Sequence, residues 1–132
     1  MLRGQAEREW GSRQPEDALC DAAMAGDVGL ARRLLAARPE LRDKVVNGYM
    51  PLMHAVIYGH TEVVEVLVDG GAQLDLQDCG GTALWWAAYG NQPAVVRFLV
   101  GRGADQTIRG DGRTPREVAV YHGHTECAAL MR

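Results

Sequence analysis

Long apolar runs are missing from this chain of 132 residues, and none approaches the roughly 18 residues that a membrane-spanning helix needs. The first ten residues, MLRGQAEREW, lack the apolar core of a signal peptide, so we expect a protein that is not secreted. Cysteine is scarce too: the three cysteines are widely spaced and form no C-x-x-C pair. This usage predicts reduced thiols in an intracellular protein, cytoplasmic or nuclear.

Positive charge is absent from the middle of the chain. Residues 47–96 contain no lysine or arginine but five acids, whereas residues 97–132 hold six arginines and four acids. A nucleic-acid-binding domain would need clustered bases and a basic balance, and the net charge here is −3. We therefore expect neither nucleic acid nor membrane as a partner.

Groups that carry chemistry are few. No glycine motif precedes a helix as a phosphate-binding loop requires. His122, His124 and Cys127 stand close in sequence, but no fourth ligand is spaced to complete a tetrahedral metal site. The cysteines also fall at unrelated positions, which does not favour a Cys–His catalytic pair. The sequence thus predicts no enzyme activity, no cofactor and no metal.

An internal repeat dominates what is present. MPLMHAVIYGHTEVVEVLVDGGA begins at Met50, and TALWWAAYGNQPAVVRFLVGRGA begins 32 residues later at Thr82. TPREVAVYHGHTECAALM follows after another 32 residues, at Thr114, and a weaker copy precedes all three from Ala18. Self-similarity at such a period is the signature of stacked repeats, with a more charged terminal copy expected.

Each unit predicts two helices. The first is short, as at 51–58, and its inner face carries alanine, which lets neighbouring helices approach closely. The second shows apolar pairs four residues apart, as in Val63-Val64 and Leu67-Val68, which is one face of an α-helix. Its charged residues, such as Glu65 and Arg97, are expected to face water.

The turn between the two helices holds a residue suited to the left-handed backbone region. These residues are Gly26, Gly59, Asn91 and Gly123. Glycine is the usual residue there and asparagine the next best tolerated, so Asn91 supports the alignment. Threonine precedes two of the first helices as an N-cap, at Thr82 and Thr114, and Asp17 is the expected N-cap of the earliest helix.

These patterns resemble the ankyrin repeat. The resemblance rests on TPREVAVYHGH, MPLMHAVIYGH, DGRTP and the GGA and RGA triplets that end the second helices. It covers residues 15–132. It implies an all-α fold, a solenoid of stacked helix–turn–helix units with short β-hairpin or turn loops. The expected repeats are 15–46, 47–78, 79–110 and a truncated 111–132, after a flexible tail at 1–14 that contains Trp10.

The sequence departs from the family pattern in several places. Two junctions are one residue short of the usual repeat of about 33 residues, which predicts tight hairpin tips at 78–82 and 110–114. Met53, Trp85 and Glu117 replace the histidine of the family's TPLH motif. Arg116 stands where a buried leucine is expected, and the exposed end of the last unit would tolerate it.

A cluster of aromatic residues, Trp85, Trp86 and Tyr89, predicts a binding surface. Consecutive residues on a helix cannot face the same way, so one tryptophan is expected between repeats and the other in the concave groove. Aromatic side chains bury a large area with few rotatable bonds, which suits binding anchors. The alternative is that these rings only fill gaps between repeats.

The resemblance implies a non-enzymatic protein–protein interaction module that is monomeric when unbound. The alternatives are an inhibitory or targeting subunit of an enzyme, and an engineered or stabilised scaffold. Because residues 47–96 have acids and no bases, we expect a partner with an apolar anchor flanked by basic residues. The predicted partner-binding residues, at hairpin tips and on first helices, are Asn47, Tyr49, Ile57, Tyr58, Cys79, Gly81, Trp86, Tyr89, Asp111, Arg113, Tyr121 and His122.

Overall fold

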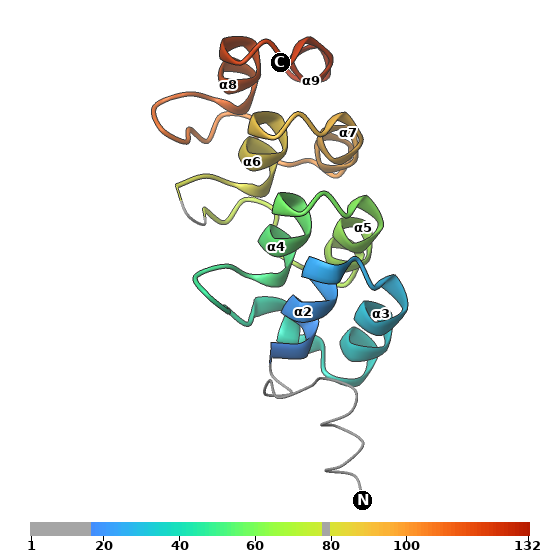
Figure 1. Cartoon of the computed structure of the whole chain (residues 1–132). Helices are drawn as coiled ribbons and strands as arrows, with labels where there is room; N and C mark the ends of the chain where they lie inside the picture. The colour runs from blue at the N-terminus through green and yellow to red at the C-terminus, as the bar shows by residue number, and fades with distance from the viewer. Residues whose placement is uncertain (1–16, 78–79) are drawn as a thin grey trace, which may run out of the picture.

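The computed structural model describes residues 17–77 and 80–132. In that part of the chain, helices follow one another in pairs that stack in chain order (Figure 1). The pairs are α2 (Ala18–Ala25) with α3 (Val28–Ala37), α4 (Pro51–Ile57) with α5 (Thr61–Asp69), α6 (Ala83–Tyr89) with α7 (Pro93–Gly101), and α8 (Pro115–Tyr121) with α9 (Thr125–Ala129). A short 3-10 helix, η2 (Pro39–Asp43), follows α3. The predicted all-α repeat solenoid is confirmed.

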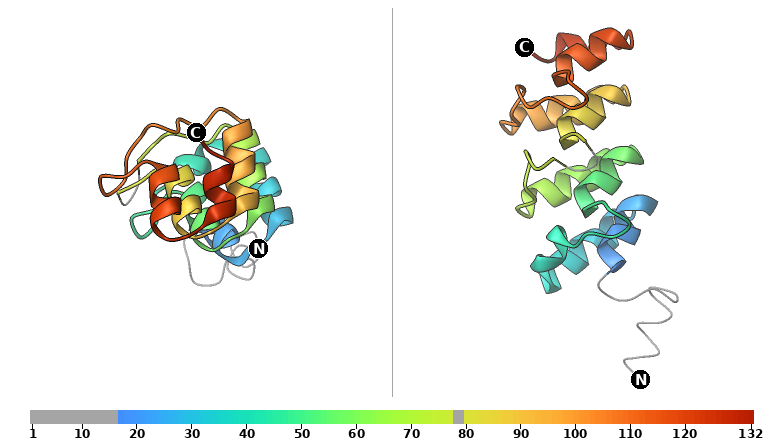
Figure 2. Two further views of the ribbon diagram at one scale, coloured as in Figure 1. Left: turned by 90° about the horizontal axis from the view of Figure 1, so that it is seen from above. Right: turned by 90° about the vertical axis from the view of Figure 1, so that its left-hand side faces the viewer.

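The first helices of the pairs form one column and the second helices form another. The loops between pairs extend to one side of the stack (Figure 1), and the side view shows the pairs as successive layers (Figure 2). The predicted tail at 1–14, with Trp10, and the predicted site residue Cys79 lie outside the described residues.

Helix starts follow from the capping residues. The hydroxyl of Thr82 accepts the N–H of Trp85, and Thr114 forms a full capping box with Glu117 at the start of α8. The carboxylate of Asp27 caps α3 by accepting the N–H of Leu30. Asp17 stands at the N-cap of α2 as predicted, but its side chain makes no capping hydrogen bond there.

The turns between paired helices adopt the left-handed conformation that the sequence predicts. Their φ angles are 76°, 77°, 56° and 75° at Gly26, Gly59, Asn91 and Gly123. One residue further on, the backbone N–H reaches back to an alanine carbonyl, as from His60 to Ala55 over 2.9 Å. This bond satisfies a carbonyl that the helix end would otherwise leave open.

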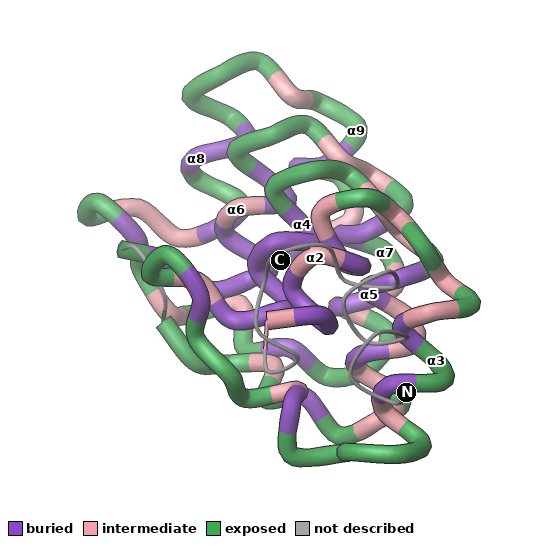
Figure 3. Tube along the Cα trace, turned by 60° about the horizontal axis from the view of Figure 1, so that its bottom comes forward, coloured by how far each residue is buried: buried purple, intermediate pink, exposed green. Residues whose placement is uncertain are grey.

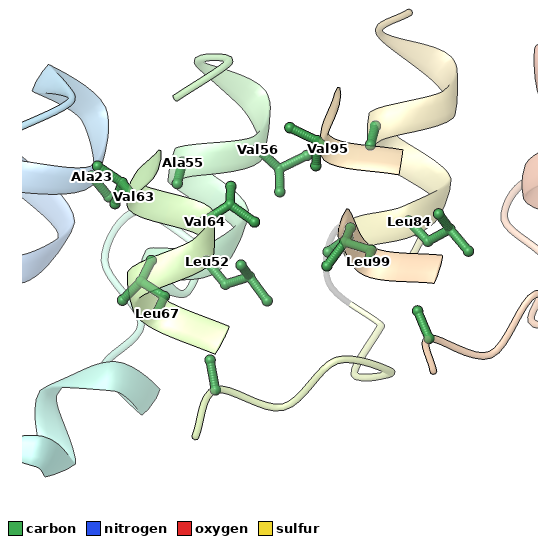
Figure 4. Packing of buried hydrophobic residues seen from close by; sticks show 14 of the residues in the cluster. Ala23, Leu52, Ala55, Val56, Val63, Val64, Leu67, Leu84, Val95 and Leu99 are labelled. Carbon is green, nitrogen blue, oxygen red and sulfur yellow. The ribbon is translucent and has the colours of Figure 1, made fainter. Parts of the chain in front are cut away.

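The core lies between the two columns and between successive pairs. Burial concentrates in the helices while the loops are exposed (Figure 3). The alanines predicted on the inner faces, such as Ala55 and Ala87, are fully buried. In Figure 4, Val64 of α5 lies toward Val95 and Leu99 of α7, so each second helix packs against the next unit. Each such valine or leucine stabilises the fold by about 1.5–3 kcal/mol when fully buried.

The last unit leaves one face uncovered. Leu52 and Leu84 occupy the same repeat position and are 2% and 0% exposed because the next unit covers them. Arg116 occupies that position on α8 and is exposed. Beside it, Val120 is 56% exposed. The position that holds a covered leucine in the two preceding units is therefore exposed to solvent at Arg116.

Candidate functional site

Two hairpin tips are described, and both are two-residue turns. Val46 and Tyr49 exchange backbone hydrogen bonds of 2.9 and 3.2 Å, and Gly110 and Arg113 exchange bonds of 2.8 and 3.0 Å. The residues between them have positive φ, including 56° at Asn47, which is typical of tight hairpins.

The prediction of a tighter tip at 110–114 is wrong, because this turn has the same length as the one at 46–49. Val46 lies 20 positions after Gly26, but Gly110 lies only 19 positions after Asn91. The missing residue therefore lies before the tip. Consistent with this, α3 has ten residues and α7 has nine.

First helices are tied to hairpins by a different group in each unit. His54 is buried, and its Nε2 lies 3.0 Å from the carbonyl of Val46, which can only accept, so this nitrogen carries the proton. In the next unit, Trp85 Nε1 donates over 3.1 Å to the carbonyl of Arg113, in the following hairpin. In the last unit, Glu117 caps its own helix instead. Unlike side chains therefore make the polar contacts of the first helices in the units that lack the histidine of the TPLH motif.

Trp85 is the tryptophan that packs between repeats, with 5% of its surface exposed. Its ring lies so close to Gly81 that a β-carbon there would come within 2.8 Å of ring atoms. Gly81, which the sequence assigned to the exposed tip, is buried. Its lack of a side chain makes room for the indole, so we remove it from the candidate surface.

A run of aromatic rings crosses from α6 to α8. Tyr89 makes edge contacts with Trp86 at 5.5 Å and with His122 at 5.0 Å, measured between ring centroids. His122 in turn contacts Tyr121 at 5.0 Å, and the guanidinium of Arg113 lies 3.9 Å above the Tyr121 ring. We call Trp86, Tyr89, Tyr121 and His122 the aromatic strip.

The strip is open to solvent over much of its length. Tyr89 is 44% exposed and Tyr121 66% exposed, while Trp86 is half-buried. These exposed fractions assign the two roles, packing between repeats and forming the binding surface, that the sequence left open for the two tryptophans. Trp85 fills the gap between units, whereas the strip presents rings outward, and the sequence could not tell which tryptophan did which.

Of the other predicted site residues, Arg113 contacts the strip through the Tyr121 ring, and the rest that are described lie on α4 and at the two hairpin tips. Ile57 and Tyr58, at the end of α4, are 41% and 56% exposed. Asn47 is exposed at its tip, and Tyr49 makes an edge contact with His54 at 5.4 Å. Asp111 is exposed at the later tip. The ring contacts found within 17–77 and 80–132 do not link the earlier group to the strip.

Comparison with known proteins decides the family. The family model for ankyrin repeats, in three copies, matches residues 19–110. The chain belongs to the ankyrin repeat family. Ankyrin repeats are generally protein–protein interaction modules, and the family is generally non-enzymatic.

Similar ankyrin repeat proteins include the human SH3 and multiple ankyrin repeat domains protein 2, with 31% identity over 113 residues, 84% of this chain and 6% of that protein. The rice probable E3 ubiquitin-protein ligase XBOS32 is 34% identical over 118 residues, 86% of this chain and 24% of that protein. Inversin from chicken is 34% identical over 113 residues, 83% of this chain and 10% of that protein. The chain thus spans less than a quarter of the length of these relatives.

A ladder of side-chain hydrogen bonds joins successive ankyrin units. His60 Nε2 lies 3.0 Å from the carbonyl of Met24, and His124 Nδ1 lies 3.0 Å from that of Ala88. Between them, Gln92 Nε2 donates over 2.6 Å to Val56. Both histidines occupy the same repeat position, in the GHTE sequences at 59–62 and 123–126, but sequence reasoning missed the bond. The signal was a polar side chain recurring just before each second helix.

The histidines near the C-terminus take part in packing. His122 and His124 stack with 5.9 Å between ring centroids. Cys127 is buried, and its Sγ donates over 3.7 Å to Oδ1 of Asn91. Burial raises the pKa of this thiol, and the neighbouring charge of Glu126 raises it further. Within the described residues, no three of the His, Cys, Asp and Glu side chains are placed to hold a metal ion.

The described acids of residues 47–96 lie on α5 and in the loop that follows it. Glu62 and Asp69 are exposed on α5, in the column of second helices, and Glu65 is half-buried there (Figure 1). The carboxylate of Asp75 accepts the backbone N–H of Asp105 over 2.8 Å. The basic flank expected of a partner was inferred from these acids, which do not lie on the first helices that carry the strip.

Membrane insertion finds no support in the helices. Across residues 17–77 and 80–132, no helix combines the length and the apolar character needed to cross a bilayer. The described helices have ten residues or fewer, and a spanning helix needs about 20.

Proposed function

We propose that this ankyrin repeat chain binds another protein through the aromatic strip and the neighbouring hairpin tips. One observation carries the proposal: a continuous set of rings, two of them about half exposed or more, stands on first helices of adjacent units. Stacked repeats place equivalent positions side by side, which creates an extended surface for a partner. Central aromatic side chains usually supply most of the binding energy at such a surface.

The strip favours a partner with an apolar anchor. Tyr89 and Tyr121 already have their ring positions fixed by contacts with His122. A ring held in place loses little conformational entropy on binding, so more of the contact energy appears as affinity. An aliphatic or aromatic side chain from the partner would gain most from this surface.

The proposal is tested by capture and calorimetry with matched variants. Wild type, Tyr89→Ala, Tyr121→Ala and Arg97→Ala are immobilised, and a lysate is passed over each. Arg97 is exposed on α7, in the other column, and serves as the control. We expect a partner that binds wild type and Arg97→Ala equally but binds each strip variant about thirtyfold more weakly, or 2 kcal/mol. Loss with Arg97→Ala alone, in folded variants, would place the site on the opposite face.

We also propose an intracellular monomer, in the cytoplasm or the nucleus. The free, buried thiol of Cys127 supports a reducing compartment. Sedimentation of the purified chain and imaging of the tagged full-length protein would test the two parts. A stable dimer, or accumulation in a secretory compartment, would contradict them.

A further inference from the structure

Three arginines gather where the aromatic strip reaches the end of the stack. Arg109 and Arg113 lie on the last hairpin, and Arg116 lies on α8. With Gly112, Glu117, Val120 and Tyr121 they line a hollow of about 490 Å³. We call it the arginine hollow. Its volume falls in the range of pockets that hold small groups, roughly 300–1,000 Å³.

The charge of the hollow is only partly neutralised. Its three guanidinium groups and one carboxylate give a net formal charge of +2. That carboxylate, Glu117, is shared: it accepts the N–H of Thr114 over 2.8 Å and lies 3.4 Å from Nη1 of Arg109. Arg116 has no ion pair with any described residue. At least two guanidinium groups are therefore open to an external anion.

Arg113 is held in a conformation suited to binding. Its guanidinium stacks 3.9 Å above the ring of Tyr121, and the side chain is half-buried. A stacked guanidinium keeps its N–H donors in its own plane, where they remain available to a carboxylate. Since Tyr121 also belongs to the aromatic strip, the strip and the hollow are parts of one surface.

The positive charge of the arginine hollow lies at one end of the aromatic strip. Residues 47–96 contain no lysine or arginine, so the strip meets positive charge at its C-terminal end. Another arginine of the last 36 residues, Arg102, is ion-paired with Asp69 on the second-helix column. A segment lying along the strip would therefore find basic groups at one end, which fixes its direction.

We propose that the arginine hollow receives an aspartate or glutamate side chain of the partner segment whose apolar residue binds the aromatic strip. This inference rests on the proposed function and reverses the charge expected from sequence, which was basic. A carboxylate on a short methylene stem fits the lining, because Val120 and Tyr121 are 56% and 66% exposed and provide apolar walls beside the arginines.

The test uses a random dodecapeptide phage library as the probe. It is panned on the wild-type chain, on the double variant Arg113→Gln/Arg116→Gln, and on the control Arg97→Gln. We expect wild type and control to select an apolar residue at fixed spacing from an acid, and the double variant to keep the apolar residue and lose the acid. The indole of Trp85 donates its hydrogen bond to the main-chain carbonyl of Arg113, and Arg113→Gln retains that carbonyl. Circular dichroism checks that each variant is folded.

Synthetic peptides then measure the coupling. We expect the double variant to bind the selected acidic peptide about tenfold more weakly than wild type does. The peptide with glutamine in place of its acid should bind wild type more weakly by a similar factor. The glutamine peptide and the double variant together should lose little further affinity. Added salt should weaken only the wild-type pairing with the acidic peptide.

The outcomes separate the two proposals. Wild-type selection without acids, or an acidic preference that survives in the double variant, would overturn the arginine hollow and leave the strip standing. Tighter binding of a phosphoserine analogue than of the glutamate peptide would reassign the hollow to phosphate. If no peptide is selected, or selected peptides ignore Tyr89→Ala and Tyr121→Ala, the proposed function fails and this inference fails with it.

Discussion

The indole N–H of Trp85 donates to the main-chain carbonyl of Arg113, 3.1 Å away, and so joins the first helix of one ankyrin unit to the hairpin of the next. The same ring covers two glycines. A β-carbon at Gly81 or Gly110 would lie 2.8 or 2.6 Å from its atoms. One side chain therefore packs against both glycines and also contacts the Trp86 and Tyr89 rings of the aromatic strip.

Gly81→Ala tests this arrangement. We expect it to lower the free energy of unfolding by about 1–3 kcal/mol, because overpacking displaces the indole. In a Trp85→Ala background the same change should have almost no effect, since the three atoms nearest to the methyl group all belong to Trp85. Urea unfolding of the four proteins gives the coupling. Equal costs in both backgrounds would show that the two positions do not interact.

The inter-helix turn gives a second prediction. Asn91 has φ 56°, so Asn91→Gly should be neutral or stabilise by a few tenths of a kcal/mol. Gly59→Val should destabilise by more than about 1 kcal/mol, because φ is 77° there while the nearest obstructing atom is 4.0 Å away. Gly101→Ala, at a glycine with open space and ordinary φ, is the control and should not destabilise. Thermal melts in which all three behave alike would refute the backbone argument.

In the hydrogen-bond ladder between units, the side chain of Gln92 is incompletely hydrogen-bonded. Its Nε2 bonds to Val56, but its buried Oε1 has no hydrogen-bond partner among residues 17–77 and 80–132. Histidine fills the same position at His60 and His124. Gln92→His should therefore stabilise by about 1 kcal/mol, since it removes an unsatisfied acceptor, while Gln92→Ala should destabilise by a similar amount. A destabilised histidine variant in chemical denaturation would show that the ring does not fit this unit.

Periodic features of this fold were predictable and unique ones were not. The positive φ at Asn91 and the buried alanines follow from positions that recur in every unit, so sequence alone located them. Trp85 and Trp86 occupy consecutive positions, and only packing against Gly81 and Gly110 decided which one is buried. The partner charge expected from sequence rests on acids counted along the chain, such as Glu62, which lies on a second helix, whereas Arg113 and Arg116 line the hollow beside the strip.

The capping box of α8 should make stability depend on pH. Accepting the N–H of Thr114 lowers the pKa of Glu117 from its ordinary value of 4.5, and the charges of Arg109 and Arg113 lower it further. A carboxyl whose folded pKa is lowered stabilises the fold above the unfolded pKa, and this contribution is lost as the pH falls through the folded pKa.

Thermal melts of Glu117→Gln measure this contribution. The variant should melt below wild type at pH 7, and the gap should narrow as the pH falls below 4.5, because the wild-type carboxyl then becomes neutral too. Thr114→Ala removes the hydroxyl that caps the helix and should destabilise at both ends of the pH range. A gap of constant size across the range would mean that the charge of Glu117 contributes nothing.

The exposed end of the stack supplies the last prediction. Leu52 and Leu84 are covered by the next unit, whereas their counterpart Arg116 faces solvent next to the exposed Val120. Burying an arginine without a partner is costly, so Arg116 opposes stacking of a second molecule on this face. Arg116→Leu should create a contiguous apolar patch and cause self-association that rises with concentration. Sedimentation velocity of this variant, with Arg97→Leu as a singly exposed leucine control, measures the effect. If both variants stay monomeric, or both associate equally, the arginine at this position has no special role in ending the stack.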